Sequence, residues 1–252
     1  MLVRGAVVLV TGASSGLGRA TAEMLAGKGA TVLLHGRDES ALRTLADRIG
    51  GAAIAVDLAE PDAAKRLAAS AVERAGRVDV LVANAGMGWA GRFSTMDRPR
   101  AGELISVNLT SPIELTRELL PAMLQRRTGH LVYVTSIAGR MGVADEAVYS
   151  ATKAGLDTFA ESLRLELRHS GVGVGTFVPG VIATDFFVRR GRPYVRKRPR
   201  PLPAESAAAA LVRLVETGAA EAYLPAWLRL PVLIRHTTPD LYRRLATRFG
   251  RS

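Results

Sequence analysis

The chain has 252 residues, of which 48% are hydrophobic and 23% are charged, a balance that is typical of a globular protein and excludes disordered and fibrous classes. Cysteine is absent, which excludes disulfide frameworks, thiolate metal sites and cysteine nucleophiles, and the four histidines lack metal-ligand spacing, so we expect no bound metal. The net charge is +11 and is concentrated in residues 189–200 and 225–252, while the rest of the chain is nearly neutral.

Short runs rich in β-branched residues predict strands that are apolar on both faces and buried in a parallel sheet. These runs are residues 6–10, 31–35, 52–56, 78–83, 130–136 and 172–178, with 220–225 as a further strand at the edge. Helical spacing alternates with them over residues 16–28, 38–49, 61–75, 97–127, 149–170 and 204–217. The alternation predicts a Rossmann-like α/β fold in one domain, residues 1–252, with a doubly wound parallel sheet of about seven strands and helices on both faces.

The N-terminal apolar run is too short for the core of a signal peptide, and no run approaches the ~18 apolar residues of a membrane span. We therefore expect a soluble, cytoplasmic protein. In a doubly wound sheet, ligands bind at the carboxyl ends of the strands, so the residues that follow each strand are the candidates for a site.

The first strand is followed by the glycine-rich stretch "TGASSGLG", residues 11–18. Glycines let the backbone approach a pyrophosphate closely, and the N-terminus of the next helix offers free N–H groups and a favourable dipole. A glycine-rich turn also occurs as a plain strand-to-helix connection, so the signal is weak alone. The expected dinucleotide contacts are Gly12, Ser14, Ser15, Gly16, Leu17 and Gly18.

The second strand ends in "HGRDES", where an acid usually binds the ribose of NAD and an arginine accommodates the 2′-phosphate of NADP. Arg37 stands there, which predicts that NADP(H) is preferred over NAD(H). The alternative is that Arg37 is a solvated surface charge and that Asp38 only caps the next helix.

The third and fourth strands also end in candidate cofactor contacts. Asp57 and Leu58 follow the third strand, where an adenine edge could be hydrogen-bonded, although an acid at a helix entrance is often only a cap. The fourth strand runs into "ANAG", so that Asn84, Ala85 and Gly86 leave room for a ribose.

Tyr149 and Lys153 in "YSATK" lie one turn apart on a predicted helix, and Ser136 stands at the end of the fifth predicted strand. A tyrosine with its usual pKa of about 10 is a poor acid–base catalyst at neutral pH. A neighbouring ammonium favours the phenolate and lowers that pKa. We therefore expect Tyr149 with Lys153 to protonate a carbonyl oxygen that Ser136 orients.

Together these motifs resemble the compact form of the short-chain dehydrogenase/reductase family, from residue 5 to about residue 224, including "SVNLTSP" and "PGVIAT". The resemblance implies that Tyr149 is the general acid/base, that Lys153 lowers its pKa and holds the nicotinamide ribose, and that Ser136 steadies the substrate carbonyl. It implies that Asn108 holds a water in a proton relay. The remaining implied cofactor contacts are Val107 near the adenine and Pro179, Gly180 and Thr184 around the nicotinamide.

The reaction that the resemblance implies is hydride transfer between NADP(H) and a small-molecule carbonyl or secondary alcohol. One departure is "ANAG" where the family usually has "NNAG", so Ala83 lacks a side-chain hydrogen bond that would stiffen the central sheet. Because Asn84 and Gly86 remain, cofactor binding is still expected.

Two other functional classes compete with an enzyme. A non-catalytic dinucleotide sensor would keep the glycine-rich turn but would tolerate loss of the tyrosine and the lysine, and both are present. A nucleic-acid-binding protein would fit the basic charge, but no nucleic-acid-binding motif is evident and only 5% of residues are aromatic. We expect no nucleic-acid partner.

The basic segment 189–200 directly follows "PGVIATD", and the resemblance implies that residues 185–203 form a substrate lid. Phe186, Phe187 and Tyr194 are candidates for an apolar lining. The arginines of this segment could meet an anionic substrate group, an acidic membrane surface or only water.

Residues 225–252 are a basic, amphipathic C-terminal extension, which is typical of peripheral contact with an anionic membrane. The resemblance also implies a homodimer or homotetramer, often joined through the late helices and the last strand. Burial in a subunit interface is therefore the competing expectation for this extension.

Overall fold

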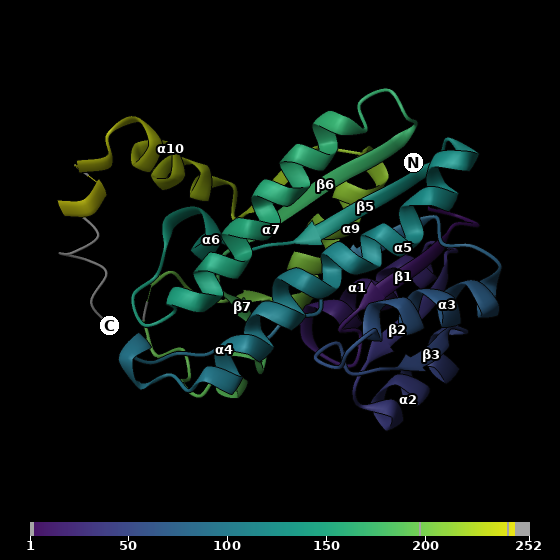
Figure 1. The fold of residues 1–252 in the computed structure, drawn as a ribbon, viewed down its shortest axis with the longest axis horizontal. Helices are drawn as coiled ribbons and strands as arrows, with labels where there is room; N and C mark the ends of the chain where they lie inside the picture. Colours follow the sequence, from purple (N-terminus) through teal and green to yellow (C-terminus); the bar gives the residue numbers. More distant parts are fainter. Residues whose placement is uncertain (1–2, 197, 241, 245–252) are drawn as a thin grey trace.

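The structure is a computed structural model that describes residues 3–196, 198–240 and 242–244 (Figure 1). Its centre is a seven-stranded sheet in the order β3-β2-β1-β4-β5-β6-β9, with every neighbouring pair parallel. The strands are β1 (Val7–Thr11), β2 (Thr31–Gly36), β3 (Ala52–Ala55), β4 (Val80–Ala83), β5 (Gly129–Val134), β6 (Val172–Pro179) and β9 (Glu221–Leu224). The predicted doubly wound sheet is confirmed, including its edge strand.

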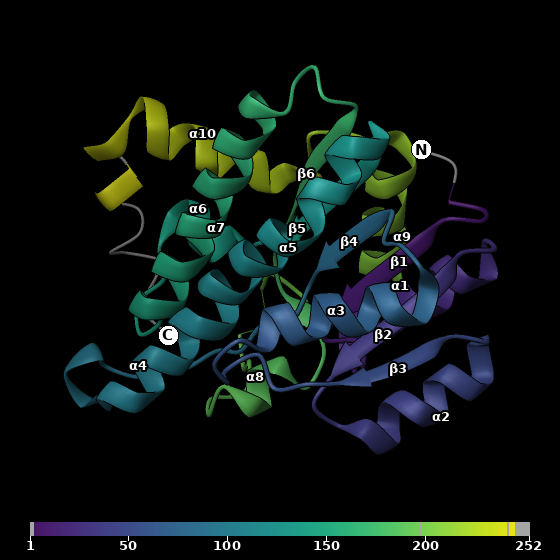
Figure 2. The same cartoon turned by 45° about the vertical axis from the view of Figure 1, so that its right-hand side comes forward.

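Helices cover both faces of the sheet because successive strand residues point to opposite sides. On one face, Val8 and Val10 of β1 share a core with α1 (Gly16–Gly27), α2 (Glu39–Ile49) and α9 (Ala204–Thr217). On the other face, Val7 and Leu9 share a core with α3 (Ala63–Ala75), α5 (Ser111–Arg126) and α7 (Ala147–Glu166). Figure 2 shows α3 and α5 on the near side of the sheet and α9 behind it.

The strand order reverses between β1 and β4, because β2 and β3 extend from β1 in one direction and β5, β6 and β9 extend from β4 in the other. At such a switch point the connections leave the sheet toward opposite faces and open a crevice at the carboxyl ends of the strands. The sheet therefore positions a binding site beside the residues that follow β1 and β4.

The predicted helix 97–127 is interrupted by a π-helical turn. It consists of α4 (Arg98–Ile105), the π-helical turn η2 (Ser106–Thr110) and α5. A π-helical turn adds one residue to a turn without breaking the run of helical backbone, and such turns occur frequently at functional sites. The apolar spacing of the sequence therefore did not reveal it.

Several short elements were not predicted, because they are too short to produce a clear apolar period. They are η1 (Phe93–Thr95), α6 (Ile137–Met141), β7 (Ile182–Ala183), α8 (Phe186–Arg189), β8 (Leu202–Pro203), η3 (Ala226–Leu228) and α10 (Arg229–Thr237). The prediction that the fifth strand continues to Ser136 is wrong. Strand β5 ends at Val134, and Ser136 is the N-cap of α6, where its Oγ accepts a hydrogen bond from the backbone N–H of Ala138 at 3.1 Å.

The described parts of the two basic segments of the sequence lie at the carboxyl-end side of the sheet. Residues 185–203 contain α8 and β8, and β8 pairs with β7 in a separate two-stranded sheet. Helix α10 follows β9 through η3 and lies near α6 (Figure 1), and its Val232 shares a small core with Val178 of β6 and Tyr223 of β9. Within these segments, Lys197, Leu241 and residues 245–252 lie outside the described residues, and no helix in the described ranges combines the length and the apolarity that crossing a bilayer requires.

Two buried histidines, His35 in β2 and His130 in β5, are each 2% exposed. Burial lowers the pKa of both imidazoles from 6.5 to about 4. Between these pH values the unfolded chain binds more protons than the folded chain, so the free energy of unfolding decreases as the pH falls. We expect this loss to reach about 3 kcal/mol per histidine.

Urea unfolding measured at several pH values between 6.5 and 4 tests this expectation. The variant His130→Gln removes one of the two titrating groups, so its stability should decline less steeply with acid than that of the wild type. The matched control is His169→Gln, because His169 is exposed. If His130→Gln and His169→Gln lost stability equally as the pH fell, burial of His130 would not be a cause of the acid sensitivity.

Candidate active site

A cleft of about 1720 Å³ lies at the carboxyl ends of the strands. Its inner wall is formed by the turn after β1, the turn after β4 and the start of α7. Its outer wall is formed by the C-terminal part of the chain. The lining residues that follow Arg192 in the sequence include Tyr194, Val195, Trp227, Ile234 and Tyr242.

The cleft brings together all the residues predicted to bind the cofactor. They are Gly12, Ser14, Ser15, Gly16, Leu17, Gly18, Arg37, Asp57, Leu58, Asn84, Ala85, Gly86, Val107, Tyr149, Lys153, Pro179, Gly180 and Thr184. Ser136 lines the same cleft, but Asn108 does not and is buried behind it.

The glycine-rich turn packs so closely that side chains are excluded at two positions. A Cβ added at Gly18 would lie 2.1 Å from the carbonyl oxygen of Gly12, and one added at Gly12 would lie 2.9 Å from the Cα of Ala85. Gly12 also has a φ of +68°, a conformation that favours glycine. The backbone therefore forms a bare cradle at the N-terminus of α1, which fits the close approach of a dinucleotide pyrophosphate.

Thr11 and Asn84 tie the ends of β1 and β4 together across the switch point. The amide Nδ2 of Asn84 donates to the carbonyl oxygen of Thr11 at 2.8 Å, and the Thr11 hydroxyl accepts from the backbone N–H groups of Asn84 at 3.0 Å and Ala85 at 2.9 Å. Thr11 is 2% exposed and was not among the predicted site residues. Its position at the start of "TGASSGLG" is the signal that could have identified it.

Arg37 lies at the rim of the cleft with its side chain 67% exposed. Its Nη1 lies 3.8 Å from Oδ2 of Asp57, and an exposed pair of this kind contributes little to stability. The other carboxylate oxygen of Asp57 accepts from the backbone N–H of Ala59 at 3.0 Å within the turn after β3, so Asp57 is not a helix cap, and the N-cap of α3 is Asp62. The guanidinium of Arg37 is therefore loosely held beside the cleft.

Tyr149 and Lys153 project from the first turns of α7, and both are buried, at 8% and 4% exposure. Burial raises the pKa of Tyr149 to about 12, although a hydrogen bond with Ser136 acts in the opposite direction. Burial lowers the pKa of Lys153 to about 8, opposed by the nearby charge of Asp157. The Lys153 Nζ donates to the carbonyl oxygen of Val134 at 2.9 Å and lies 6.0 Å from the centre of the Tyr149 ring.

The expectation that Lys153 lowers the pKa of Tyr149 therefore differs from the structure. The ammonium is held by a strand-end carbonyl rather than by the phenol, and the loss of water around Tyr149 has the larger effect. At neutral pH the site has a protonated phenol beside a largely protonated lysine, which is an arrangement able to donate a proton.

Asn108 lies in the π-helical turn η2 and is 1% exposed. Its side chain accepts from the backbone N–H of Met87 and donates to the carbonyl oxygen of Met87, both at 2.9 Å. It also donates to Thr152 Oγ1 at 3.2 Å, and that hydroxyl donates to the carbonyl oxygen of Tyr149 at 2.8 Å. Asn108 therefore joins the turn after β4 to the helical turn that carries Tyr149.

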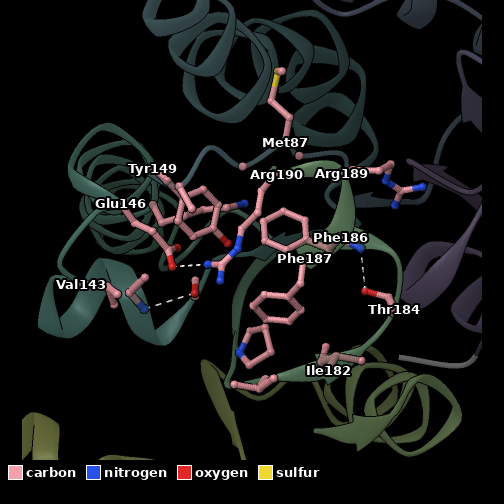
Figure 3. Close-up of a pocket in the computed structure, with 18 of the residues that line it drawn as sticks. Met87, Val143, Glu146, Tyr149, Ile182, Thr184, Phe186, Phe187, Arg189 and Arg190 are labelled. Atoms are coloured by element: carbon pink, nitrogen blue, oxygen red, sulfur yellow. Dashed lines mark hydrogen bonds and ion pairs between the residues drawn. The ribbon is translucent and has the colours of Figure 1, made fainter. Parts of the chain in front are cut away.

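A row of aromatic rings leads from Tyr149 toward the outside of the cleft. Ring centres are 5.6 Å apart for Tyr149 and Phe186, 5.5 Å for Phe186 and Phe187, and 5.3 Å for Phe187 and Tyr194. The three residues expected to line an apolar pocket therefore lie in the cleft, and Figure 3 shows Phe186 beside Tyr149.

A buried ion pair between Arg190 and Glu146 lies next to this row (Figure 3). The side chains are 9% and 13% exposed, and the guanidinium also lies over the ring of Phe187 at 4.6 Å from its centre. Glu146 is the N-cap of α7, directly before the turn with Tyr149. The pair was not predicted, because its members are far apart in sequence and neither belongs to a motif.

The sequence profile described as short chain dehydrogenase matches residues 6–193. An uncharacterized oxidoreductase of Myxococcus xanthus is 36% identical over 239 residues, which is 92% of either chain. A 3-oxoacyl-acyl-carrier-protein reductase of Vibrio cholerae is 36% identical over 187 residues, or 73% of this chain and 77% of the relative.

Solved structures resemble the whole fold. A short-chain dehydrogenase from Sphingobium yanoikuyae in complex with NADPH has a TM-score of 0.83 at 28% identity, over 98% of this chain and 96% of that one. A short chain dehydrogenase/reductase from Burkholderia phymatum in complex with NAD has a TM-score of 0.85 at 26% identity, over 96% of both chains.

Proposed function

The chain belongs to the short-chain dehydrogenase/reductase family, and on this premise we propose that it is an NADP(H)-dependent oxidoreductase that interconverts a carbonyl compound and the corresponding alcohol. The observation that carries the proposal is that Ser136, Tyr149 and Lys153 line one cleft with the glycine cradle. Relatives of similar structure bind NADPH in one case and NAD in another, which supports a nicotinamide dinucleotide as the cofactor.

Each polar side chain has a part in this reaction. When bound, the nicotinamide supplies a hydride to the carbonyl carbon or accepts one from the alcohol. Tyr149, which is protonated at neutral pH, donates its phenolic proton to the carbonyl oxygen. The hydroxyl of Ser136 orients the same oxygen, and Lys153 holds positive charge and the nicotinamide ribose. Asn108 supports Tyr149 through Thr152, beside the predicted water relay.

The cofactor contacts follow from the cradle. The N–H groups at the start of α1 face the pyrophosphate, while Asn84 and Gly86 leave room for a ribose. A Cβ added at Gly86 would lie 3.3 Å from Oδ1 of Asn108 and 3.5 Å from Nζ of Lys153, so a side chain at this position would fill the space beside these two polar groups.

Arg37 is proposed to bind the 2′-phosphate of NADP(H). We expect Arg37→Ser to reduce the preference for NADPH over NADH about tenfold, because a charge-assisted hydrogen bond is lost from an exposed site. The measurement is kcat/KM for both cofactors. The control is Arg43→Ser, which removes an equally exposed charge from α2, where Arg43 pairs with Glu39. An unchanged ratio in Arg37→Ser would show that Arg37 does not contact the phosphate.

The substrate is proposed to be an apolar ketone or aldehyde, held under a lid formed by residues 185–203. Apolar side chains that line the cleft support this class. They are Ile137, Met141, Val143, Val181, Phe186, Phe187 and Leu228. Their burial against an apolar substrate would stabilise binding without any charged contact.

An NADPH-oxidation screen across ketosteroids, 3-ketoacyl thioesters, quinones and simple aldehydes tests the proposal. We expect turnover with bulky apolar carbonyl compounds to exceed turnover with small aldehydes. Binding of NADPH without oxidation by any carbonyl compound would instead support the non-catalytic sensor.

A further inference from the structure

Two adjacent arginines at the end of α8 point in opposite directions. Figure 3 shows Arg190 directed toward Glu146 and Arg189 directed away from it. The Nη1 of Arg189 donates to the hydroxyl of Ser15 at 3.1 Å, across 174 positions of sequence. One short segment therefore contacts both the start of α7 and the glycine-rich turn.

The contact with Ser15 places the Arg189 guanidinium at the cofactor cradle. Ser15 is the N-cap of α1, and its hydroxyl makes no hydrogen bond to the backbone of its own helix. The N–H groups after it are those that face an anion at a helix N-terminus. Thr184, just before α8, also packs here, because a Cβ at Gly16 would lie 3.0 Å from its Cγ2.

Arg189 and the residues around Tyr149 are carried by the same backbone. Phe186 of α8 packs on Tyr149, and Arg190 pairs with Glu146. The carbonyl oxygen of Arg190 also accepts from the backbone N–H of Ala90 at 3.2 Å. A displacement of α8 would therefore alter the cradle contact and the cover over Tyr149 together.

We propose that Arg189 is a cofactor-binding residue that the lid contributes to the pyrophosphate, so that cofactor binding and lid closure strengthen each other. The inference rests on the proposed function. A phosphate oxygen at the cradle is a stronger acceptor for a guanidinium than the Ser15 hydroxyl, because the phosphate is itself negatively charged and both partners of the hydrogen bond are then ionised. Coupling of this kind is reciprocal, so a closed lid must raise the cofactor affinity by the factor by which the cofactor favours closure.

The test compares Arg189→Ala, Arg189→Lys and the control Arg200→Ala in the full chain. Arg200 is an exposed arginine of the same segment, so its loss changes the net charge equally. Dissociation constants for NADPH and NADH are measured by fluorescence titration without substrate. We expect Arg189→Ala to weaken both cofactors about tenfold, Arg189→Lys to retain most of the affinity, and Arg200→Ala to match the wild type.

Two further readouts separate a phosphate contact from a structural role. The effect of Arg189→Ala should shrink in ~1 M salt, where the screening length falls to about 3 Å. Hydrogen exchange in residues 185–196 should slow when cofactor is added to the wild type and to Arg200→Ala, but not when it is added to Arg189→Ala.

Distinct outcomes refute distinct claims. Equal affinities for Arg189→Ala and Arg200→Ala would overturn the inference, and a loss confined to NADPH would assign Arg189 to the 2′-phosphate instead of the pyrophosphate. Cofactor-induced protection that persists in Arg189→Ala would overturn the coupling. A wild-type protein that binds neither cofactor would refute the proposed function itself.

Discussion

Tyr149→Phe should lower turnover by about a thousandfold or more while leaving the dissociation constant of NADPH within about twofold, since a general acid typically contributes 10²–10⁴-fold. The substitution removes the hydroxyl that carries the proton, and it keeps the ring that packs on Phe186 at 5.6 Å. Burial of the site excludes bulk water as a ready substitute for the missing acid. Steady-state NADPH oxidation and fluorescence titration provide the two measurements.

The matched control is Tyr194→Phe, which removes the same hydroxyl from another tyrosine of the cleft. The Tyr194 hydroxyl donates to the carbonyl oxygen of Pro199 at 2.8 Å, so it is bonded within its own segment. We expect this variant to keep at least half of the wild-type turnover. A Tyr149→Phe enzyme that retained more than about a tenth of the activity would show that another group donates the proton.

Gly18→Ala should abolish high-affinity binding of both NADPH and NADH. The added Cβ would lie 2.1 Å from the carbonyl oxygen of Gly12 and 2.6 Å from Nδ2 of Asn84. These atoms belong to the cradle and to the Thr11–Asn84 link between β1 and β4, so α1 must move outward to relieve the overlap. A displacement of about 1 Å can cost about a hundredfold in function, and overpacking of this kind also costs about 1–3 kcal/mol of stability.

The control for this prediction lies in the same helix. A Cβ added at Gly27 meets nothing within 4 Å, so Gly27→Ala should bind cofactor normally and unfold at an equal or higher temperature. Thermal unfolding and cofactor titration are measured on both variants. Normal cofactor affinity in Gly18→Ala would mean that the close packing of the turn is not needed to hold the dinucleotide.

The sheet was predictable because its inner strands β1, β4 and β5 are buried along their whole length. Runs such as 6–10 are continuous in apolar residues, a pattern that is typical of strands in a parallel sheet. The shorter elements were not predictable in the same way. Helix α8 spans only Phe186–Arg189, and its position depends on contacts with residues distant in sequence, such as Ser15 and Glu146.

The pKa values of the site residues were harder to predict than the identity of those residues. The spacing of Tyr149 and Lys153 indicates that they share a helix face, but it carries no information about how many atoms surround them. Phe186 covers the phenol, and Val134 supplies the carbonyl that holds the ammonium. Burial is the sum of such remote contacts, so the direction of the Tyr149 pKa shift became evident only from the folded chain.

The division of the cleft into two walls has a consequence for how this protein can be re-engineered. The cradle and the Ser136–Tyr149–Lys153 group lie within residues 6–193, the part that matches the family profile. Much of the outer wall, including Tyr194, Trp227 and Tyr242, lies beyond it on late loops and on the segment after β9. Replacing these late stretches with those of a relative should therefore change the substrate specificity and leave the proposed catalytic residues in place, because loops tolerate exchange on a rigid scaffold.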